Sequence, residues 1–366
     1  LLTASYVDDA IRKLEAEIKS KELLFLCEMG LDPGIDHMSA MQLIDSIKAR
    51  GGQITSFKSH CGGLVAPESD DNPWHYKISW NPRNIIMAGK AGAVYKEHGQ
   101  VVRKKYEELF DPEKIVKVND EDIYAYYPNR DSLPYIDLYN LSGIDTFIRT
   151  TLRHPEFSFG WKNIVDLKLT EEEKIYDTDG MTVAEFFKEH FDKHGFQEWI
   201  TNMLTARLGY AKEMMEKLMS LMDAEEQLAK EGVEDNDFMM VDEKGELSSM
   251  DVDDIKDKAA ESVASKMHEA NLTLKQLFFL GLDDQETMVN LGHCSAADIL
   301  QFAMEKKLTL RPYDKDMIVM LHEFEYIIGN KTSGIKSSLV VKGENSLRTA
   351  MAKTVGLPLG IAAKLI

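Results

Sequence analysis

The sequence lacks the features that mark secreted and membrane proteins. Only three cysteines, Cys27, Cys61 and Cys294, occur among its 366 residues. They are odd in number and widely spaced, so they provide neither a disulfide framework nor a metal-binding motif, and they indicate a reducing compartment. No apolar run is long enough to span a membrane, and no signal-peptide pattern occurs. We therefore expect a cytoplasmic protein without a metal site or a membrane partner.

Positive charge is also scarce. Lys and Arg number 43 against 62 Asp and Glu, which gives a formal net charge of −19. A field of this sign repels phosphate and so argues against nucleic acid as a partner. A small anionic ligand would need a local cluster of arginines. The chain is too long for one ordinary core, so we expect two or three domains, and a homodimer is left open.

The N-terminal residues have the pattern of a βαβ unit. The stretch from Leu1 to Tyr6 is typical of the end of a strand, and Asp8-Asp9 followed by apolar residues at helical spacing predicts a helix. The run from Leu23 to Cys27 is typical of a buried parallel strand. Strand, helix and strand at this spacing predict a crossover connection.

A turn rich in proline and glycine, at residues 30–37, follows the second of these strands. Asp36 is placed to cap the next helix. Ligands of parallel sheets bind beyond the carboxyl ends of the strands, so we expect Ser5, Tyr6 and Asp32 to converge on one site. The alternative is that Ser5 and Asp32 are only turn residues.

Beyond Gln53 the pattern changes to that of a mixed or antiparallel sheet. Gln53 to His60 is strand-like, Glu113 to Tyr127 contains two strand-like runs, and two late runs, Glu323–Ile327 and Ser337–Val341, predict a hairpin. Residues 211–270 have helical spacing with many charges, which favours a solvated helical insertion. At the C-terminus a further helix is expected over 360–366, with Pro358 in its first turn.

Several side chains in this second region suit a ligand site, and each has a simpler explanation. Cys61-Gly62-Gly63 is expected on a loop where backbone can approach a ligand, although a single cysteine is more often a small core residue. Trp80 could stack on a ligand or fill a core. Arg130 and Arg153 suit two-pronged binding of carboxylates, whereas each by itself also suits a surface salt bridge.

A set of ordered motifs resembles one family, the glutamate-forming saccharopine dehydrogenases. The motifs are 30-GLDPGIDH-37, 61-CGGL-64, 67-PES-69, 71-DNP-73, 127-YPNRDS-132, 151-TLR-153 and 350-AMAKTVGLP-358. The resemblance is dense over residues 3–153 and again over 313–366. Residues of about 199–284 look enlarged relative to compact members.

The resemblance implies an α/β fold in which a Rossmann domain is split around an inserted α+β substrate domain. Residues 1–40 and 345–366 would be the remainder of the Rossmann domain. Residues 41–344 would form the substrate domain, with a mixed or antiparallel sheet and a helical insertion at about 199–284.

The resemblance also assigns ligand roles. Residues expected around saccharopine are Ser5, Tyr6, Asp32, Gly62, Gly63, Arg130, Thr151, Leu152 and Arg153. Residues expected near the nicotinamide of NADP or NAD are Leu31, Asp32, Pro33, Trp80, Asn81 and Pro82. Proton transfer would fall to Tyr6, Asp32 or Cys61, with His37 a further candidate by position, and the sequence does not rank them.

The implied reaction is oxidation of saccharopine, with NADP or NAD and water, to L-glutamate and 2-aminoadipate 6-semialdehyde in lysine metabolism. Two alternatives stay open: a related carboxynorspermidine or homospermidine-type polyamine dehydrogenase, and a non-catalytic fragment. No G-x-G-x-x-G phosphate loop occurs in these 366 residues. We therefore expect them to bind a nicotinamide cofactor poorly by themselves, and to be inactive if the protein has no such loop.

Overall fold

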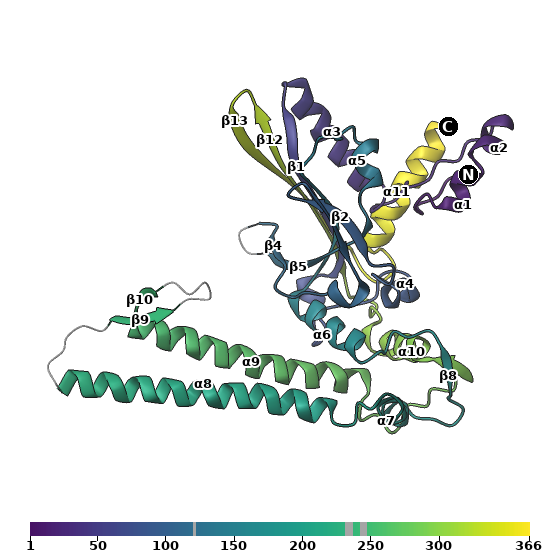
Figure 1. The fold of residues 1–366 in the computed structure, drawn as a ribbon. Coiled ribbons are helices and arrows are strands. Elements are labelled where there is room, and N and C mark those ends of the chain that lie inside the picture. The colour runs from purple at the N-terminus through teal and green to yellow at the C-terminus, as the bar shows by residue number, and fades with distance from the viewer. Residues whose placement is uncertain (120–121, 231–236, 242–246) are drawn as a thin grey trace. The chain divides into compact units, whose positions relative to one another are not determined.

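The computed structural model describes residues 1–119, 122–230, 237–241 and 247–366. The chain forms two compact units (Figure 1). One contains Leu1–Asp177 and Leu291–Ile366, and the other contains Thr178–Asn290. Among the described residues, no helix has the length and the apolar character needed to cross a membrane.

A mixed sheet is the framework of the first unit. Its main path runs in the order β13, β12, β1, β7, β2, β3. The strands are β1 (Gln53–Val65), β2 (Ala93–Glu97), β3 (Gln100–Lys104), β7 (Thr146–Arg153), β12 (Asp316–Ile328) and β13 (Lys331–Lys342). β1 pairs in parallel with β7 and antiparallel with β12. The sheet is thus mixed, as the sequence predicted.

Shorter strands extend this sheet beside β7 and β2. The two strand-like runs predicted over 113–127 are β4 (Ile115–Lys117) and β5 (Ile123–Pro128). They pair antiparallel, and β5 also pairs with β7. β6 (Arg130–Asp131) pairs in parallel with β2. The late hairpin is confirmed, because β12 and β13 pair in register from Met317 opposite Lys342 to Ile328 opposite Lys331.

Helices cover one face of the sheet. α3 (Ile35–Ala49) and α5 (Pro134–Leu138) pack on it through a core that includes Ile44, Tyr139, Phe57, Phe147 and Phe324. Because side chains alternate along a strand, these residues all lie on one side of β1, β7 and β12. α11 (Ala350–Leu365) covers the same side nearer the start of β12.

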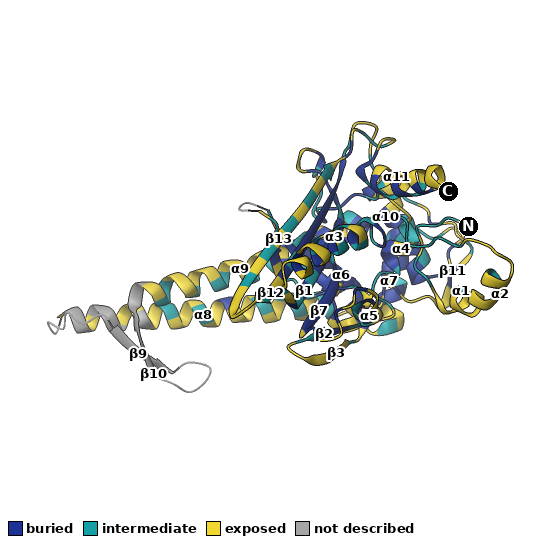
Figure 2. Ribbon diagram, turned by 90° about the horizontal axis from the view of Figure 1, so that it is seen from above, coloured by how far each residue is buried: buried dark blue, intermediate teal, exposed yellow. Residues whose placement is uncertain are grey.

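The opposite face of the sheet carries a second core. It contains Leu64, Leu152, Val319 and Leu321 from the central strands, against Tyr124 of β5. Figure 2 shows that burial is concentrated in the central strands, whereas β13 alternates between half-buried and exposed residues. The central strands β1 and β7 are therefore covered on both sides. A polar side chain on either strand is consequently surrounded by packed residues, which restrict its conformation.

The remaining elements of the first unit lie around the ends of the sheet. They are α4 (Pro82–Ile86), α6 (Pro155–Asp166), β8 (Lys174–Asp177), β11 (His293–Ser295), α10 (Ala296–Leu308) and two 3₁₀ turns, Pro67–Ser69 and Tyr106–Glu108. β8 pairs with β11 in a separate two-stranded sheet.

The N-terminal crossover forms with less regular structure than the sequence predicted. Two short helices, α1 (Asp9–Lys13) and α2 (Glu15–Ser20), lie between segments that meet in a single parallel bridge, Leu2 to Leu26. Both Leu23 and Leu24 are exposed. The prediction of a buried strand over 23–27 is therefore wrong. The parallel direction of the two segments is as expected.

Three other local predictions are also wrong. Cys61-Gly62-Gly63 lies inside β1 and not on a loop. α11 runs continuously through Pro358, so no separate helix starts after it. Asp36 lies in the first turn of α3 but does not cap it from outside, since Gly34 occupies the N-cap position and donates its backbone N–H to the Asp36 carboxylate.

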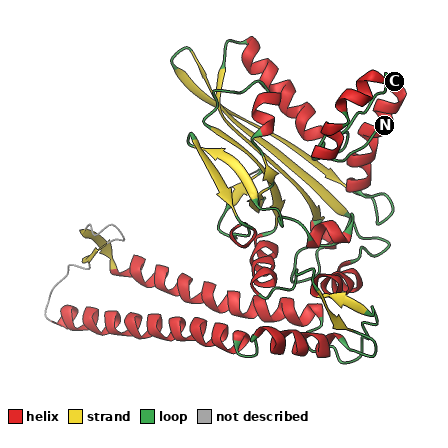
Figure 3. Cartoon of the chain, turned by 45° about the vertical axis from the view of Figure 1, so that its right-hand side comes forward, coloured by secondary structure: helices red, strands yellow, loops and turns green. Residues whose placement is uncertain are grey.

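The second unit is mainly helical. It contains α7 (Val183–His194), α8 (Trp199–Lys230), β9 (Asp237–Val241), β10 (Leu247–Asp251) and α9 (Val252–Leu280). The long helices α8 and α9 lie side by side (Figure 3). A capping box of Thr182 and Glu185 starts α7, and Gly195 ends it in the left-handed conformation. The helical insertion expected over 199–284 falls within this unit, while the division into Rossmann and substrate domains stays a prediction.

Candidate functional site

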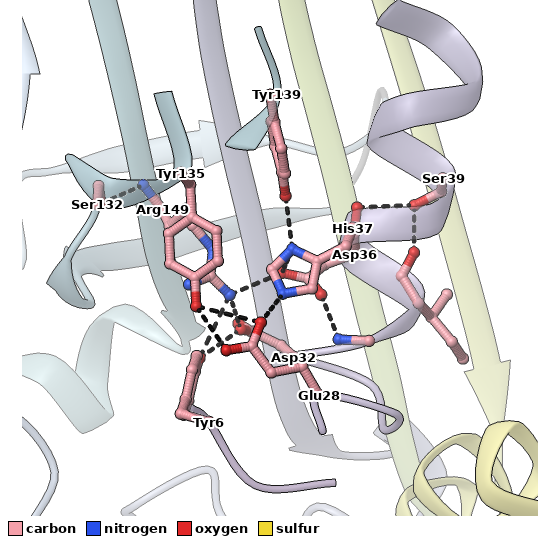
Figure 4. A network of polar contacts seen from close by, with 12 residues as sticks. Tyr6, Glu28, Asp32, Asp36, His37, Ser39, Ser132, Tyr135, Tyr139 and Arg149 are labelled. Atoms are coloured by element: carbon pink, nitrogen blue, oxygen red, sulfur yellow. Dashed lines mark hydrogen bonds and ion pairs between the residues drawn. The ribbon is translucent and has the colours of Figure 1, made fainter. Parts of the chain in front are cut away.

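A buried arginine lies at the centre of the polar cluster between β7 and α3. Arg149 is 2% exposed and points from β7 toward the N-terminus of α3. Its Nη2 atom lies 2.5 Å from Asp32 Oδ1 and 2.7 Å from Asp36 Oδ2 (Figure 4). Burial alone would lower the pKa of Arg149, but Asp32, Tyr6 and Asp36 outweigh it and raise this pKa. Two carboxylates therefore neutralise one guanidinium, and the group of three keeps one negative charge.

Tyr6 joins this cluster from the N-terminal segment. Its hydroxyl donates to Asp32 Oδ1 at 2.8 Å, and Arg149 Nη2 donates to the same hydroxyl at 3.3 Å. Burial and the neighbouring Asp32 carboxylate raise the pKa of Tyr6 well above its ordinary value. The phenol is thus neutral and fixed as a hydrogen-bond donor. The structure brings Tyr6 and Asp32 together, as expected from their strand ends.

The two carboxylate oxygens of Asp32 differ in the hydrogen bonds that they accept. Both hydrogen bonds that it accepts from the described residues end on Oδ1. Oδ2 is consequently the oxygen with capacity to accept from a ligand. Burial raises the pKa of Asp32, and Arg149 opposes this shift. A carboxylate of this kind accepts a proton more readily than one in water.

The turn before α3 holds Asp32 and Asp36 on the same side of Arg149. Gly30 N–H donates to Pro33 O at 2.9 Å, and this closes a tight loop. Gly34 sits at φ +147°, and a Cβ there would lie 2.0 Å from Gly30 O. Only glycine fits this position. The glycines of the 30–37 motif are therefore explained by the loop that carries both carboxylates.

A second buried arginine lies on the same face of β7. Arg153 is 3% exposed, and its guanidinium lies over the rings of Tyr76, at 5.3 Å, and Phe157, at 5.4 Å. It donates from Nη1 to Leu152 O at 2.7 Å, while its buried Nε has no hydrogen-bond partner. Among the described residues no carboxylate forms an ion pair with it. An uncompensated buried cation is costly, so this site suits an anionic ligand.

Cys61 lies on β1 opposite the segment of β7 that carries Arg149 and Arg153. It pairs with Thr151 across β1 and β7 and is buried. Burial raises the pKa of its thiol, with further contributions from Asp32 and Asp36, whereas Arg149 and Arg153 oppose the shift. The neutral thiol is a poor proton acceptor.

The other residues assigned to the substrate differ in accessibility. Arg130 is exposed at the start of β6, at φ +54°, and its guanidinium lies 5.0 Å from the centre of the Tyr6 ring. Thr151 is half-buried and Leu152 is fully buried on the opposite face of β7. Ser5 is exposed and takes no part in the hydrogen bonds around Asp32.

The two glycines of β1 face different neighbours. A Cβ at Gly62 would lie 2.6 Å from Leu152 O, so the absence of a side chain allows β1 and β7 to pack. A Cβ at Gly63 would meet the Met351 side chain at 2.5 Å, with Ser79 Oγ at 4.0 Å. Gly62 is therefore a packing residue, whereas Gly63 borders the surface between α11 and the segment before α4.

The residues assigned to the cofactor lie at two places. Leu31 and Pro33 are buried in the loop that holds Asp32, and Leu31 packs in one core with Cys61 and Ala350. Trp80 is 37% exposed, and its indole N–H donates to the Tyr76 hydroxyl at 3.1 Å. Asn81 caps α4 by accepting from Arg83 N–H, and Pro82 follows as its first residue.

Sequence reasoning missed the central residue, Arg149, and gave Asp36 only a capping role. Glu28, which contacts His37 near the same cluster, was also missed. A signal for Arg149 was present, because residues two apart on a strand share a face. Arg149, Thr151 and Arg153 satisfy this spacing. No comparable signal marked Glu28.

Comparisons with known proteins agree with this architecture. Residues 30–366 match the family model described as the saccharopine dehydrogenase C-terminal domain. An alpha-aminoadipic semialdehyde synthase of Arabidopsis thaliana is 30% identical over 374 residues. The match includes 100% of this chain and 31% of that protein. The saccharopine dehydrogenase [NADP(+), L-glutamate-forming] of Saccharomyces cerevisiae is 28% identical over 367 residues, with 100% of this chain and 70% of that protein covered.

A solved structure of a related protein has a similar fold. Apo saccharopine dehydrogenase (L-Glu forming) from Saccharomyces cerevisiae superposes with a TM-score of 0.71 at 27% identity. The superposition covers 100% of this chain and 70% of that one. Fold and site define an α/β protein with an acidic cluster on one face of a mixed sheet and, on the same face, a buried arginine that has no carboxylate partner among the described residues. The chain belongs to the saccharopine dehydrogenase C-terminal domain family.

Proposed function

We propose that this chain supplies the substrate-binding part of a saccharopine dehydrogenase that forms L-glutamate with NADP or NAD. The observation that carries the proposal is the buried guanidinium of Arg153, which has no carboxylate partner among the described residues. Saccharopine has three carboxylates and one secondary amine. A site with Arg153 on one side and the net negative Asp32–Arg149–Asp36 group on the other matches both kinds of charge.

Arg153 and Arg130 are the residues we assign to the carboxylates of saccharopine. Arg149 is not assigned this role, because the carboxylates of Asp32 and Asp36 already compensate its charge. A guanidinium binds a carboxylate through two parallel hydrogen bonds, which an ammonium group cannot match. A polyamine substrate is disfavoured, since its cations would be repelled by Arg153.

Asp32 is the residue we assign to the secondary amine. Its Oδ2 would accept a hydrogen bond from the amine and then take up its proton, while Oδ1 stays bound to Tyr6 and Arg149. The raised pKa of Asp32 favours this transfer. Loss of hydride from the carbon next to the nitrogen gives an imine. Water then adds to it, and the adduct breaks down to glutamate and the semialdehyde.

The nicotinamide cofactor would supply the hydride acceptor when bound. Two features of this chain fit its ring: the buried Leu31 next to Asp32, and the partly exposed Trp80, which is linked to Arg153 through Tyr76. No glycine-rich phosphate loop occurs in these residues, so their contribution is limited to the nicotinamide end. A homodimer stays a prediction, which sedimentation of the full-length protein would test.

The test is steady-state kinetics of the full-length protein with saccharopine and each cofactor. Arg153→Lys keeps the charge but loses the paired geometry, and Arg153→Ala loses both. We expect kcat/KM to fall by roughly thirtyfold to a thousandfold for Arg153→Ala, as for loss of about 2–4 kcal/mol in a desolvated site, and by less for Lys. Cofactor affinity should not change. Arg311→Ala, at an exposed ion pair with Asp71, is the matched control. A stable Arg153→Ala variant with wild-type kcat/KM would overturn the proposed site.

A further inference from the structure

Glu28 has a left-handed backbone conformation and several polar contacts. It lies at φ +58°, in the left-handed region that residues with a Cβ rarely adopt. Such a conformation persists where the surrounding structure fixes it, and it often marks a functional position. The Glu28 side chain is 17% exposed. It lies between the N-terminal segment, α3 and α5 (Figure 4).

The contacts of Glu28 fix the chain on both sides of Tyr6. Its backbone N–H donates to Ser5 O at 3.0 Å. Its carboxylate oxygen Oε1 accepts from Val7 N–H at 3.1 Å. Ser5 and Val7 are the two chain neighbours of Tyr6. The direction in which the Tyr6 phenol points therefore depends on Glu28.

Other groups keep the carboxylate of Glu28 in place. His37 Nε2 lies 2.9 Å from Oε2, and the Tyr135 hydroxyl donates to Oε1 at 3.3 Å. His37 is held in turn by Tyr139, whose hydroxyl lies 2.6 Å from Nδ1, and by stacking on Tyr135 at 5.0 Å. Burial opposes the charge on Glu28, but contacts with His37 and Val7 N–H lower its pKa below the ordinary value. The carboxylate is a fixed, charged acceptor.

We propose that Glu28 is a positioning residue, which holds residues 5–7 so that the Tyr6 hydroxyl donates to Asp32 Oδ1 and leaves Oδ2 for the substrate amine. The inference rests on the proposed function of Asp32. The placement of Tyr6, however, is a property of the chain without ligand and can be measured separately. What Glu28 must provide is an acceptor for Val7 N–H, which glutamine also provides and alanine does not.

The first experiment measures the accessibility of Tyr6 in the full-length protein without ligand. Tyrosines are acetylated with N-acetylimidazole, and the rate at each is followed by peptide mass spectrometry. Tyr313, which is 90% exposed, and Tyr95, which is 1% exposed, serve as internal references. We expect Glu28→Ala to raise the rate at Tyr6 by roughly tenfold or more, as for loss of a hydrogen bond to a charged group. Glu28→Gln should stay within about threefold of wild type, because the acceptor is kept.

Two further variants complete this experiment. Glu22→Ala is the matched control, because Glu22 also has a positive φ, at +53°, and lies on the same segment. It should leave the rate at Tyr6 unchanged. Glu28→Asp, which is one methylene shorter, replaces Glu28→Ala if that variant does not fold, and it should also expose Tyr6. An unchanged rate at Tyr6 in both variants, or an equal rise at Tyr95, would overturn the inference.

The second experiment is a double-mutant cycle on turnover of saccharopine. If Glu28 acts through Tyr6, Glu28→Ala should lower kcat/KM roughly tenfold in the wild-type background and less than about threefold in Tyr6→Phe. If Glu28→Ala lowers kcat/KM by the same factor in both backgrounds, the two residues act independently and the positioning role is contradicted. If the wild-type protein does not turn over saccharopine, the proposed function fails. The acetylation rates then still decide the role of Glu28.

Discussion

Replacement of Arg149 by Met tests whether one guanidinium holds the two carboxylates of the site together. Methionine fills much of the same volume without charge. Nη2 lies within 2.7 Å of both carboxylates, and the side chain is buried. Removal of one partner from a buried ion pair costs about 3–5 kcal/mol, because the remaining charge is uncompensated. Two carboxylates remain here, so we expect a loss near the upper end of that range at neutral pH.

The pH dependence of this loss has a definite sign. Burial raises the pKa of Asp32 even with Arg149 present, and removal of Arg149 raises it further. A carboxyl group whose pKa is higher in the folded state stabilises the fold fully below its unfolded pKa. This stabilisation is lost as the pH rises through the folded pKa. The deficit of Arg149→Met should therefore be small near pH 4 and grow toward pH 8.

Urea unfolding followed by tryptophan fluorescence measures this deficit. Three of the four tryptophans, Trp74, Trp80 and Trp161, lie in the first unit and report on it. Arg130→Met, at an exposed position, is the control and should change stability by less than about 0.5 kcal/mol. Addition of Asp36→Asn to Arg149→Met should recover part of the loss. Equal stability of Arg149→Met and wild type at pH 8, or a deficit that does not change with pH, would refute this account of the cluster.

Two further predictions concern the sheet around the site. Gly62→Ala places a Cβ 2.6 Å from Leu152 O and should destabilise the first unit by about 1–3 kcal/mol in urea unfolding. Gly334→Ala, where the contact is 3.5 Å, should have little effect, and equal losses would contradict the packing argument. Burial lowers the pKa of His322 to about 4. The neutral imidazole therefore contributes to the stability of the fold above the unfolded pKa, and this contribution is lost as the pH falls through 6.5 toward 4. His322→Gln should therefore lose less stability than wild type between pH 7 and 4.5, and an identical acid slope in both proteins would exclude His322 as the cause.

Sequence alone predicted those parts of the fold that depend on local pattern. The hairpin of β12 and β13 follows from its strand-like runs and turn residues, and the structure confirms it. The two strand-like runs over 113–127 are confirmed as β4 and β5. The long helices α8 and α9 follow from helical spacing. The failures have a common cause, which is that long-range packing overrides local signals. Cys61-Gly62-Gly63 contains two glycines yet lies inside β1, because a backbone without side chains lets β7 approach.

The site was predictable only where the two parallel N-terminal segments, joined by the bridge between Leu2 and Leu26, meet. Tyr6 and Asp32 could be placed together from the βαβ pattern, and the 2.8 Å hydrogen bond between them agrees. Arg149 could have been found from its strand face, whereas its pairing with Asp36 depends on the loop at Gly34. Glu28 could not have been found, because its contacts join residues 7, 37 and 135, which only the tertiary fold brings together.

Burial and pairing together separate the roles of three arginines, of which sequence alone singled out Arg130 and Arg153 and did not distinguish them. Arg149 is buried and its charge is compensated by two carboxylates, so it orients Asp32. Arg153 is equally buried but lacks a carboxylate partner among the described residues, so its charge is stabilised best when an anion binds. Arg130 is exposed above Tyr6, where water screens it and a ligand can displace that water. Of these three arginines, Arg153 is the one that is buried without a carboxylate partner among the described residues. A ligand carboxylate should therefore bind first and most strongly at Arg153, with the amine then directed toward Asp32.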